Sequence, residues 1–320
     1  MSAQKPIVVV GSINTDLVAV TKKIPDVGET VIGSDFQIHP GGKGANQAVA
    51  VARLGYPVQL IGRLGNDRFG AELRTYLEKS GVDMTGVSAS DCASGVAMIV
   101  VSEIGENSIV LAPGANAEVT TKDIDANISI LKQAGMVLAQ LEIPVETVEY
   151  LARVCARENV PLILDPAPAR ELPLSIFKDI AWFTPNQTET TFYLWNKHSE
   201  SNPQRPGEIA RILLSNGCQG VVLKMGADGT CVGSKGGVGS LVSAFSVDAI
   251  DTTGAGDAFN AGFATGLMLG KSPVDSAIFA SAVAAISVTR TGAQPSMPSM
   301  AEVEAFMKAN FTEARELTQR

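Results

Sequence analysis

The chain has 320 residues, a formal net charge of −8 at neutral pH and two histidines. This length suits one large α/β domain or two small ones. An acidic chain without a block of lysine and arginine is a poor nucleic-acid binder, and no apolar run is long enough to span a bilayer. Because His39 and His198 are the only histidines, a His-based triad is nearly excluded, and acid–base chemistry falls to carboxylates.

The cysteines and the N-terminus indicate the compartment. Cys92, Cys155, Cys218 and Cys231 lie far apart in apolar surroundings and form no CxxC pair. We therefore expect buried free thiols in a reducing cytoplasm. The first six residues lead directly into an apolar strand, so the sequence indicates no signal peptide.

The first predicted strand is the β-branched run from Ile7 to Val10, which is typical of a strand buried on both faces. It places Asn14 and Asp16 near the carboxyl end of that strand, where open α/β sheets bind ligands. Both side chains can hydrogen-bond the hydroxyls of a polyol. An Asx-turn that closes the strand is the alternative interpretation.

A small separate sheet is predicted next. Residues 17–40 contain short alternating pieces, of which 18–20 and 30–32 read as strands. A predicted hairpin further along, residues 97–101 and 108–111, can join the same small sheet.

A glycine-rich segment then precedes a predicted helix, in the run Pro40 to Ala48. Its glycines allow the backbone to come close to a ligand, and the helix presents its N-terminal N–H groups. Gly42, Lys43 and Asn46 are therefore candidate sugar contacts. Beyond this point strands and helices alternate in the doubly wound manner, and one predicted strand ends at Glu142.

Two later segments are candidates for nucleotide binding. Asn186 and Glu189 are three residues apart at a predicted helix start, a spacing that suits water-mediated contact with Mg²⁺ and phosphate. The local pattern also describes an N-cap with its capping-box partner, and on these residues alone we favour that interpretation. The strand from Val221 leads into a glycine-rich turn that ends at Gly229, and this turn could border a nucleotide-binding site.

Neither a Walker A loop nor a GxGxxG fingerprint is present in the sequence, which counts against a P-loop NTPase and a Rossmann dehydrogenase.

The segment Asp251 to Phe259 predicts a phosphate cradle. The glycines at 254 and 256 allow a tight turn whose N–H groups can approach an anion, and Asp257 lies in the first turn of the following helix. Asp257 is the candidate general base for a hydroxyl that attacks a phosphoryl group. The alternative is that it is only a favourable acid at a helix N-terminus.

The last informative segment is a small-residue helix, residues 276–288, broken by the loop from Thr289 to Ser296. The loop offers carbonyls and a hydroxyl, the hard oxygen ligands that an alkali cation needs. An ordinary helix-terminating loop is an equally good local interpretation.

Taken together, these segments resemble the ribokinase-like (PfkB) carbohydrate kinases over almost the whole chain. The motifs that carry the resemblance are Gly11 to Asp16, Gly41 to Ala48, Pro185-Asn186 with Glu189, Asp251 to Asp257, and Thr289 to Ser296. The resemblance implies an α/β fold, a doubly wound and mostly parallel sheet flanked by helices. It also implies one domain over residues 1–320, with a β-sheet lid at about 15–40 and 95–112 that forms a homodimer contact.

The resemblance also implies roles for individual residues. Asp257 matches the catalytic base and also contacts the sugar, and the other sugar positions are Asn14, Asp16, Gly42, Lys43, Asn46 and Glu142. The ATP positions are Asn186, Lys224, Met225, Gly226, Ala227, Asp228, Gly229, Gly254, Ala255, Gly256 and Ser281. Glu189 belongs to the magnesium-associated Asn-x-x-Glu motif. The monovalent-cation site, for K⁺, matches Asp251, Thr253, Ser287, Arg290, Gly292 and Ser296.

Three positions depart from the family pattern. Lys224 stands where some members carry Thr, the phosphate turn begins with Gly254 where some have Ala, and Ser281 replaces an Asn often seen near the adenine. The expected reaction is ATP-dependent phosphorylation of the primary hydroxyl of a pentose, D-ribose at O5. The alternatives are a fructokinase, a deoxyribose or nucleoside kinase, or a non-catalytic sensor of sugar or nucleotide.

Overall fold

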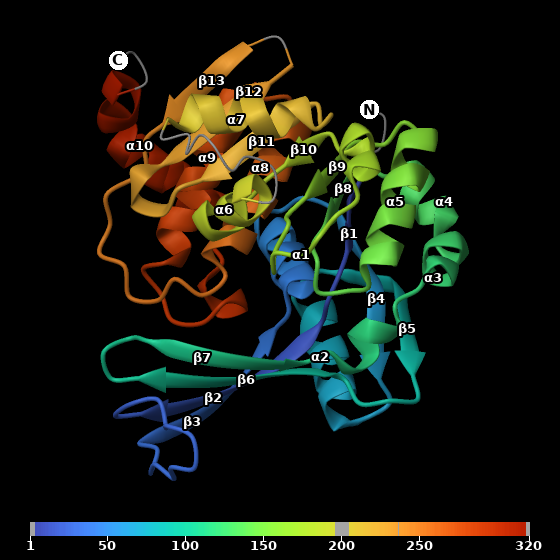
Figure 1. The fold of residues 1–320 in the computed structure, drawn as a ribbon, viewed down its shortest axis with the longest axis vertical. Helices are drawn as coiled ribbons and strands as arrows, with labels where there is room; N and C mark the ends of the chain where they lie inside the picture. The colour runs from blue at the N-terminus through green and yellow to red at the C-terminus, as the bar shows by residue number, and fades with distance from the viewer. Residues whose placement is uncertain (1–3, 196–204, 236, 318–320) are drawn as a thin grey trace.

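The computed structural model describes residues 4–195, 205–235 and 237–317. A nine-stranded sheet forms its centre, in the order β13-β12-β11-β10-β9-β8-β1-β4-β5 (Figure 1). The strands are β1 (Ile7–Val10), β4 (Val58–Gly65), β5 (Asp83–Ser90), β8 (Met136–Ala139), β9 (Leu162–Leu164), β10 (Trp182–Phe183), β11 (Gly220–Lys224), β12 (Thr230–Ser234) and β13 (Gly237–Val242). The strands from β11 to β5 run parallel, and β12 and β13 complete one edge as antiparallel strands.

The central strand β1 shows why the sheet is covered on both faces. All four of its side chains are fully buried between β4 and β8. Ile7 and Val9 belong to one hydrophobic cluster, and Val8 and Val10 belong to a second. Because successive side chains of a strand point to opposite faces, the two clusters are the two faces of the sheet.

Helices cover each face. The cluster containing Ile7 includes residues of α1 (Lys43–Arg53), α2 (Arg68–Lys79), α8 (Ala255–Met268), α9 (Pro273–Ser287) and α10 (Met300–Leu317). The opposite cluster includes residues of α3 (Thr121–Ala126), α4 (Ile128–Gln133), α5 (Val145–Arg157), α6 (Gln187–Trp195) and α7 (Pro206–Ser215). Short 3₁₀ turns are η1 (Gly114–Glu118), η2 (Leu174–Asp179), η3 (Gly226–Asp228) and η4 (Gln294–Ser296). The prediction of a doubly wound, mostly parallel sheet flanked by helices is confirmed.

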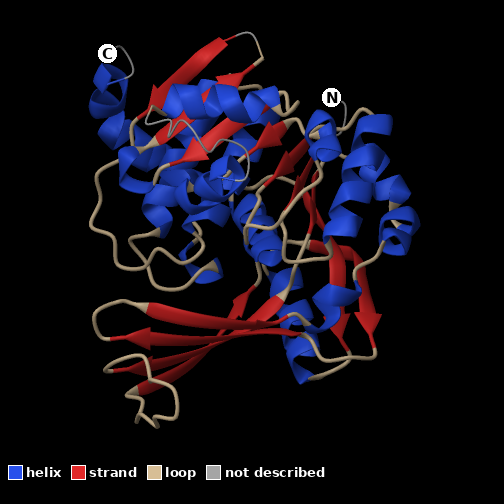
Figure 2. Cartoon of the chain, in the orientation of Figure 1, coloured by secondary structure: helices blue, strands red, loops and turns tan. Residues whose placement is uncertain are grey.

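A second sheet of four strands lies apart from the main body, at lower left in Figure 2. We call it the lid sheet, and its order is β3 (Asp35–Gly41), β2 (Asn14–Thr21), β6 (Gly95–Ser102) and β7 (Asn107–Ala112). The pair β2 and β6 is parallel, whereas β2–β3 and β6–β7 are antiparallel. The predicted lid segments, about 15–40 and 95–112, match these strands to within one residue at each end of the first segment.

One predicted lid strand is wrong. Residues 30–32 form no strand, and the partner of β2 is the later segment from Asp35 to Gly41. The register ends where Val20 faces Asp35, so residues 30–32 extend past the last paired position and have no strand to bond with. The side chain of Ile32 is consequently almost fully exposed.

Among the residues that the structure describes, no helix combines the length and the apolar character needed to cross a membrane.

Candidate active site

The carboxyl edge of the main sheet collects the polar side chains that follow its parallel strands. Asn14 comes shortly after β1, Gln140 follows β8, Asp165 follows β9, and Lys224 ends β11. Ligands bind at this edge in open α/β sheets. Helix α1 crosses the same edge, where Gln47 contacts Gln140 and Asp165.

Asp257 lies at this edge in the first turn of α8, as predicted. Its side chain is buried, and both carboxylate oxygens accept hydrogen bonds from amides of α1. Asn46 Nδ2 donates to Oδ2 at 2.9 Å, and Gln47 Nε2 donates to Oδ1 at 3.1 Å. The carboxylate is therefore held by a neighbouring helix, which a simple helix-end acid does not require.

Burial raises the pKa of Asp257, because desolvation disfavours its charged form. Lys43 and the two amides act in the opposite direction, while the nearby Asp165 carboxylate raises the pKa further. A carboxylate with an increased affinity for protons is better suited to accept one from a hydroxyl at neutral pH.

The predicted sugar residues also come together. Ser12 Oγ and the backbone N–H of Lys43 both donate to Glu142 Oε2, the latter at 3.2 Å. Burial, together with the charges of Glu142 and Asp257, raises the pKa of Asp16 to about 7. Burial alone would lower the pKa of Lys43, but these carboxylates outweigh it and raise the pKa above its ordinary value. Three carboxylates and one ammonium thus share a small volume.

The glycine segment before α1 serves close packing. Gly42 has φ of 87°, and a Cβ there would lie 2.7 Å from the backbone nitrogen of Asn14. A Cβ on Gly44 would lie 2.6 Å from the carbonyl carbon of Gly11. These glycines therefore allow α1 to pack against the end of β1. From the sequence we expected them instead to let the backbone come close to a ligand. The role of Gly42 as a sugar contact stays a prediction.

Asn14 is oriented by a residue that the sequence analysis missed. Asn116 in η1 donates from Nδ2 to Asn14 Oδ1 at 2.7 Å, and its Oδ1 accepts from the N–H of Ile13 at 2.9 Å. With its oxygen engaged, Asn14 has its Nδ2 donor left for a ligand. No local sequence signal identifies Asn116, since its partners are about a hundred positions away.

The phosphate turn and the nucleotide loop both rely on glycine. Gly254 is the N-cap of α8 and has φ of 75°, a left-handed conformation that favours glycine. No side chain caps this helix start, so N–H groups of its first turn are left for a ligand. In the loop after β11, Gly226 and Gly229 also have positive φ, and the N–H of Met225 donates to Gly229 O at 2.9 Å. Ala227 and Asp228 complete η3 between them.

Asn186 and Glu189 form a local cap at the start of α6. Asn186 donates through its backbone N–H and its Nδ2 to the two oxygens of Glu189, and Glu189 N–H donates back to Asn186 Oδ1. The capping-box interpretation is thus correct locally. Burial and the charge of Asp165 nevertheless raise the pKa of Glu189.

The predicted cation residues lie in two adjoining segments. Asp251 ties them together, because its Oδ1 accepts from Thr253 N–H at 2.9 Å and its Oδ2 from Gly292 N–H at 2.8 Å. These bonds outweigh the effect of burial and lower the pKa of Asp251. The hydroxyls of Ser287 and Ser296 donate to carbonyls three residues earlier in the chain. The Arg290 guanidinium is turned to Glu302, so Arg290 has only its carbonyl to offer a cation.

The base is supported by glutamines that the sequence analysis did not single out. Gln140 Nε2 donates to Gln47 Oε1 at 2.7 Å, and Gln47 in turn holds Asp257 and Asp165. Gln294 Nε2 donates to Asn46 Oδ1 at 3.0 Å, which fixes the amide that contacts Asp257. Gln47 follows Asn46 directly in the sequence, but its two carboxylate partners are more than a hundred positions away.

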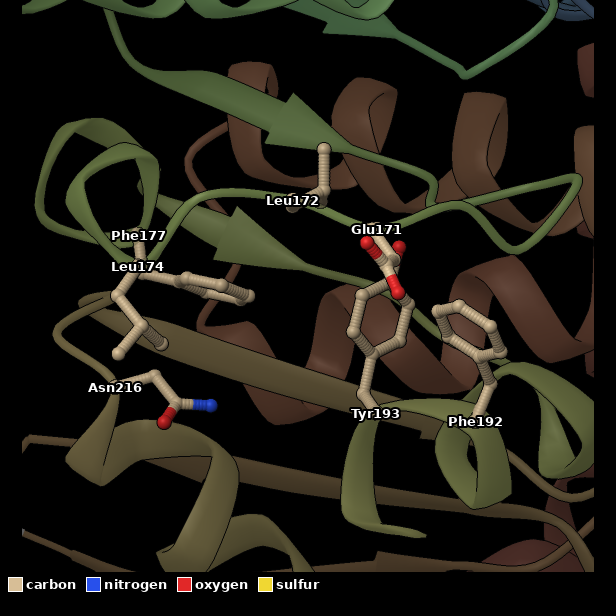
Figure 3. A pocket seen from close by; sticks show the side chains of 7 residues that line it. All are labelled: Glu171, Leu172, Leu174, Phe177, Phe192, Tyr193 and Asn216. Atoms are coloured by element: carbon tan, nitrogen blue, oxygen red, sulfur yellow. The ribbon is translucent and has the colours of Figure 1, made fainter. Parts of the chain in front are cut away.

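Two other features lie away from this cluster. Ser281 is buried in the middle of α9, and its contact with adenine stays a prediction. A cavity of about 160 Å³ opens between η2 and α6, and Figure 3 shows Tyr193 and Phe192 beside Glu171, with Phe177 next to Leu174. None of the predicted site residues lines that cavity.

Comparisons with known proteins identify the family of this chain. The model of the pfkB family carbohydrate kinases matches residues 4–300. The ribokinase of Schizosaccharomyces pombe is 40% identical over 306 residues, which cover 93% of this chain and 96% of that protein.

Solved structures of similar fold belong to the same kind of enzyme. The ribokinase of Thermotoga maritima has a TM-score of 0.88 and 39% identity, over 95% of this chain and 99% of its own. A ribokinase of Arabidopsis thaliana, solved with ribose and ATP, has a TM-score of 0.87 and 33% identity over the same shares of the two chains. The chain therefore belongs to the pfkB family of carbohydrate kinases.

Proposed function

We propose that this protein transfers the γ-phosphoryl group of ATP to the primary hydroxyl of a pentose, D-ribose at O5. The observation that carries the proposal is the buried Asp257 carboxylate, held by two amides between a polyol-binding cluster and an open helix N-terminus. The similarity to ribokinases, one of them solved with ribose and ATP, supports the choice of sugar and nucleotide.

In the proposed reaction, Asp257 accepts the proton of the sugar hydroxyl. The hydroxyl oxygen forms a bond to the γ-phosphorus, and the bond from that phosphorus to the β–γ bridging oxygen breaks, so that ADP leaves. The N–H groups of residues 254–257 face the developing negative charge and stabilise it.

The remaining sugar contacts follow from the donor and acceptor types at the cluster. Asn14 offers its Nδ2 donor, because Asn116 engages its oxygen. Asp16 and Glu142 offer acceptors for hydroxyls, and Gly42, Lys43 and Asn46 line the same edge. A pentose with several adjacent hydroxyls matches this alternation of donors and acceptors.

The nucleotide is assigned to the loop from Lys224 to Gly229 and to the turn from Gly254 to Gly256, with Asn186 and Ser281 beside it. Mg²⁺ would neutralise charge on the phosphates of ATP. Glu189 fits such an ion through water, because both of its oxygens already accept hydrogen bonds from Asn186.

A monovalent cation such as K⁺ is assigned to the segments that Asp251 joins. The donors are all oxygens, with the single carboxylate of Asp251 and carbonyls of residues 253, 287, 290 and 292 beside the Ser296 hydroxyl. A site with one carboxylate favours a large monovalent ion over a divalent one, which draws more negative ligands. Because Asp251 also bonds Thr253 N–H, these residues hold the start of the phosphate turn.

We further propose a homodimer formed through the lid sheet. The paired residues Ile38, Leu17, Met98 and Val110 form one row across its four strands. Met98 is 46% exposed, Ile38 54% and Val110 58%. An apolar row left open to water on a thin sheet is a surface for another chain to cover.

All four cysteines are free thiols, and we expect the enzyme to act in the reducing cytoplasm.

A substrate panel tests the proposed reaction. Release of ADP is followed with ribose, 2-deoxyribose, fructose and adenosine at saturating Mg-ATP, and we expect ribose to give the highest kcat/KM. A higher value for another acceptor would transfer the assignment to a deoxyribose, fructose or nucleoside kinase. Tight sugar binding without release of ADP would instead identify a non-catalytic sensor.

A further inference from the structure

The ammonium of Lys224 lies against the phosphate turn. Lys224 ends β11, and its Nζ is 3.6 Å from the position that a Cβ on Gly256 would occupy. Gly256 belongs to the first turn of α8, whose N-terminus carries partial positive charge. A helix N-terminus disfavours a cation beside it, so a negative group must hold Lys224 there.

That group is Asp165. Lys224 Nζ donates to Asp165 Oδ1 at 2.8 Å, and the two side chains are only 11% and 3% exposed. Strand β10 separates β11 from β9 in the sheet, so the lysine side chain spans a whole strand to reach its partner. The pair therefore lies across the carboxyl edge, above the ends of three strands.

The other oxygen of Asp165 connects this pair to the base. Gln47 Nε2 donates to Asp165 Oδ2 at 3.2 Å and to Asp257 Oδ1 at 3.1 Å. The four side chains Lys224, Asp165, Gln47 and Asp257 thus form one continuous hydrogen-bonded chain from the nucleotide loop to the catalytic carboxylate.

We propose that Lys224 is a catalytic residue that exchanges its bond with Asp165 for a bond to the γ-phosphoryl group of ATP. An anion that binds the N–H groups at the start of α8 arrives within reach of the ammonium, and a triphosphate carries more charge than one carboxylate. The lysine keeps its proton throughout and stabilises charge that develops on the phosphoryl oxygens. This inference rests on the proposed phosphoryl transfer and adds a catalytic role for Lys224.

The main test compares Lys224→Met with Lys224→Arg. We expect Lys224→Met to lower kcat about a hundredfold while the KM for sugar changes less than about twofold, and Lys224→Arg to retain part of the activity. The matched control is Lys235→Met, because Lys235 is exposed just after β12 and donates to Gly217 O in the turn between α7 and β11, at the opposite end of β11 from Lys224. It should behave like the wild type.

Nucleotide binding separates a phosphoryl contact from a structural ion pair. In the absence of sugar, Lys224→Met should weaken the Kd of a non-hydrolysable ATP analogue about tenfold and that of ADP much less. This measurement does not depend on the sugar, so it stands even where ribose proves to be the wrong acceptor. Equal losses for the analogue and for ADP would overturn the role assigned to Lys224.

The loss of a buried partner also needs its own control, since Lys224→Met leaves the Asp165 carboxylate unpaired. The double variant Lys224→Met/Asp165→Asn removes both charges. We expect it to recover the Tm lost by the single variant but not the lost kcat. Recovery of kcat together with Tm would show that the pair is purely structural and would contradict the proposal.

Discussion

At the scale of the residue, Asp257 is distinguished from an ordinary helix-end acid by its partners. Its two oxygens accept from Asn46 and Gln47 of another helix, and burial raises its pKa. We predict that Asp257→Asn lowers kcat about a hundredfold or more and weakens the sugar Kd less, because general-base assistance acts mainly in the transition state. A coupled assay of ADP release measures kcat, and calorimetric titration with the sugar measures Kd. Near-native turnover would show that Asp257 is not the base.

Asp16 gives a prediction about pH. Burial and the neighbouring acids raise its pKa to about 7, so in the free enzyme its carboxyl is neutral below that pH and charged above it. A carboxylate accepts hydrogen bonds from hydroxyls more strongly than a neutral carboxyl does. We therefore predict that the KM for sugar rises as the pH falls through 7.

The matched variant for this prediction is Asp16→Asn. It keeps the size of the side chain and removes the titration, so its KM should be higher and nearly independent of pH across the same interval. A wild-type KM that stays constant on both sides of pH 7 would mean that the Asp16 proton does not affect sugar binding.

At the scale of the element, the sequence predicts what depends on local pattern. The β-branched run of β1, the helix start at Asp257 and the glycine turn at Gly254 are all where the pattern placed them. The strand predicted at residues 30–32 is wrong because pairing depends on the length of β2, a tertiary property. Asp165 and Gln47 were not assigned roles for a similar reason, since their importance arises from partners far away in the chain.

Lid closure is a prediction about β2, β3, β6 and β7. Asn14 and Asp16, the proposed sugar contacts, lie within β2, so a bound sugar touches the lid sheet directly. A cover over the reacting groups keeps water from accepting the phosphoryl group. We predict that ribose lowers amide hydrogen exchange across these four strands, with the main-sheet strands β8 and β9 as the internal reference. Exchange that is the same with and without ribose would argue against closure.

The two segments joined by Asp251 give a prediction about potassium. If an ion fixes the turn from Gly254 to Asp257, its N–H groups are held toward the developing charge before the reaction begins. We predict that K⁺ raises activity well above an equal concentration of a bulky organic cation at fixed Mg²⁺ and ionic strength. Asp251→Ala should remove the difference between the two salts. Equal rates for the wild type in both salts would show that these segments are only structural.

At the scale of the whole molecule, the lid sheet has two different faces. Asn14 and Asp16 alternate with Leu17 along β2, so the face that carries Leu17 is turned away from the sugar residues. Across the sheet, that outward face continues through Ile38, Met98 and Val110. In Figure 2 the tips of the lid strands extend clear of the described helices, and a second copy of the chain is the cover we propose for the outward face.

The corresponding prediction is that Met98→Lys yields a monomer. A lysine at the centre of the row would bring two like charges into a symmetric, apolar contact, where removing them from water is costly. The matched control is Leu241→Lys, because Leu241 is an exposed aliphatic side chain on β13 of the main sheet. Sedimentation analysis should give a dimer for the wild type and for Leu241→Lys, and a monomer with an unchanged circular dichroism spectrum for Met98→Lys. A dimeric Met98→Lys protein would place the contact elsewhere.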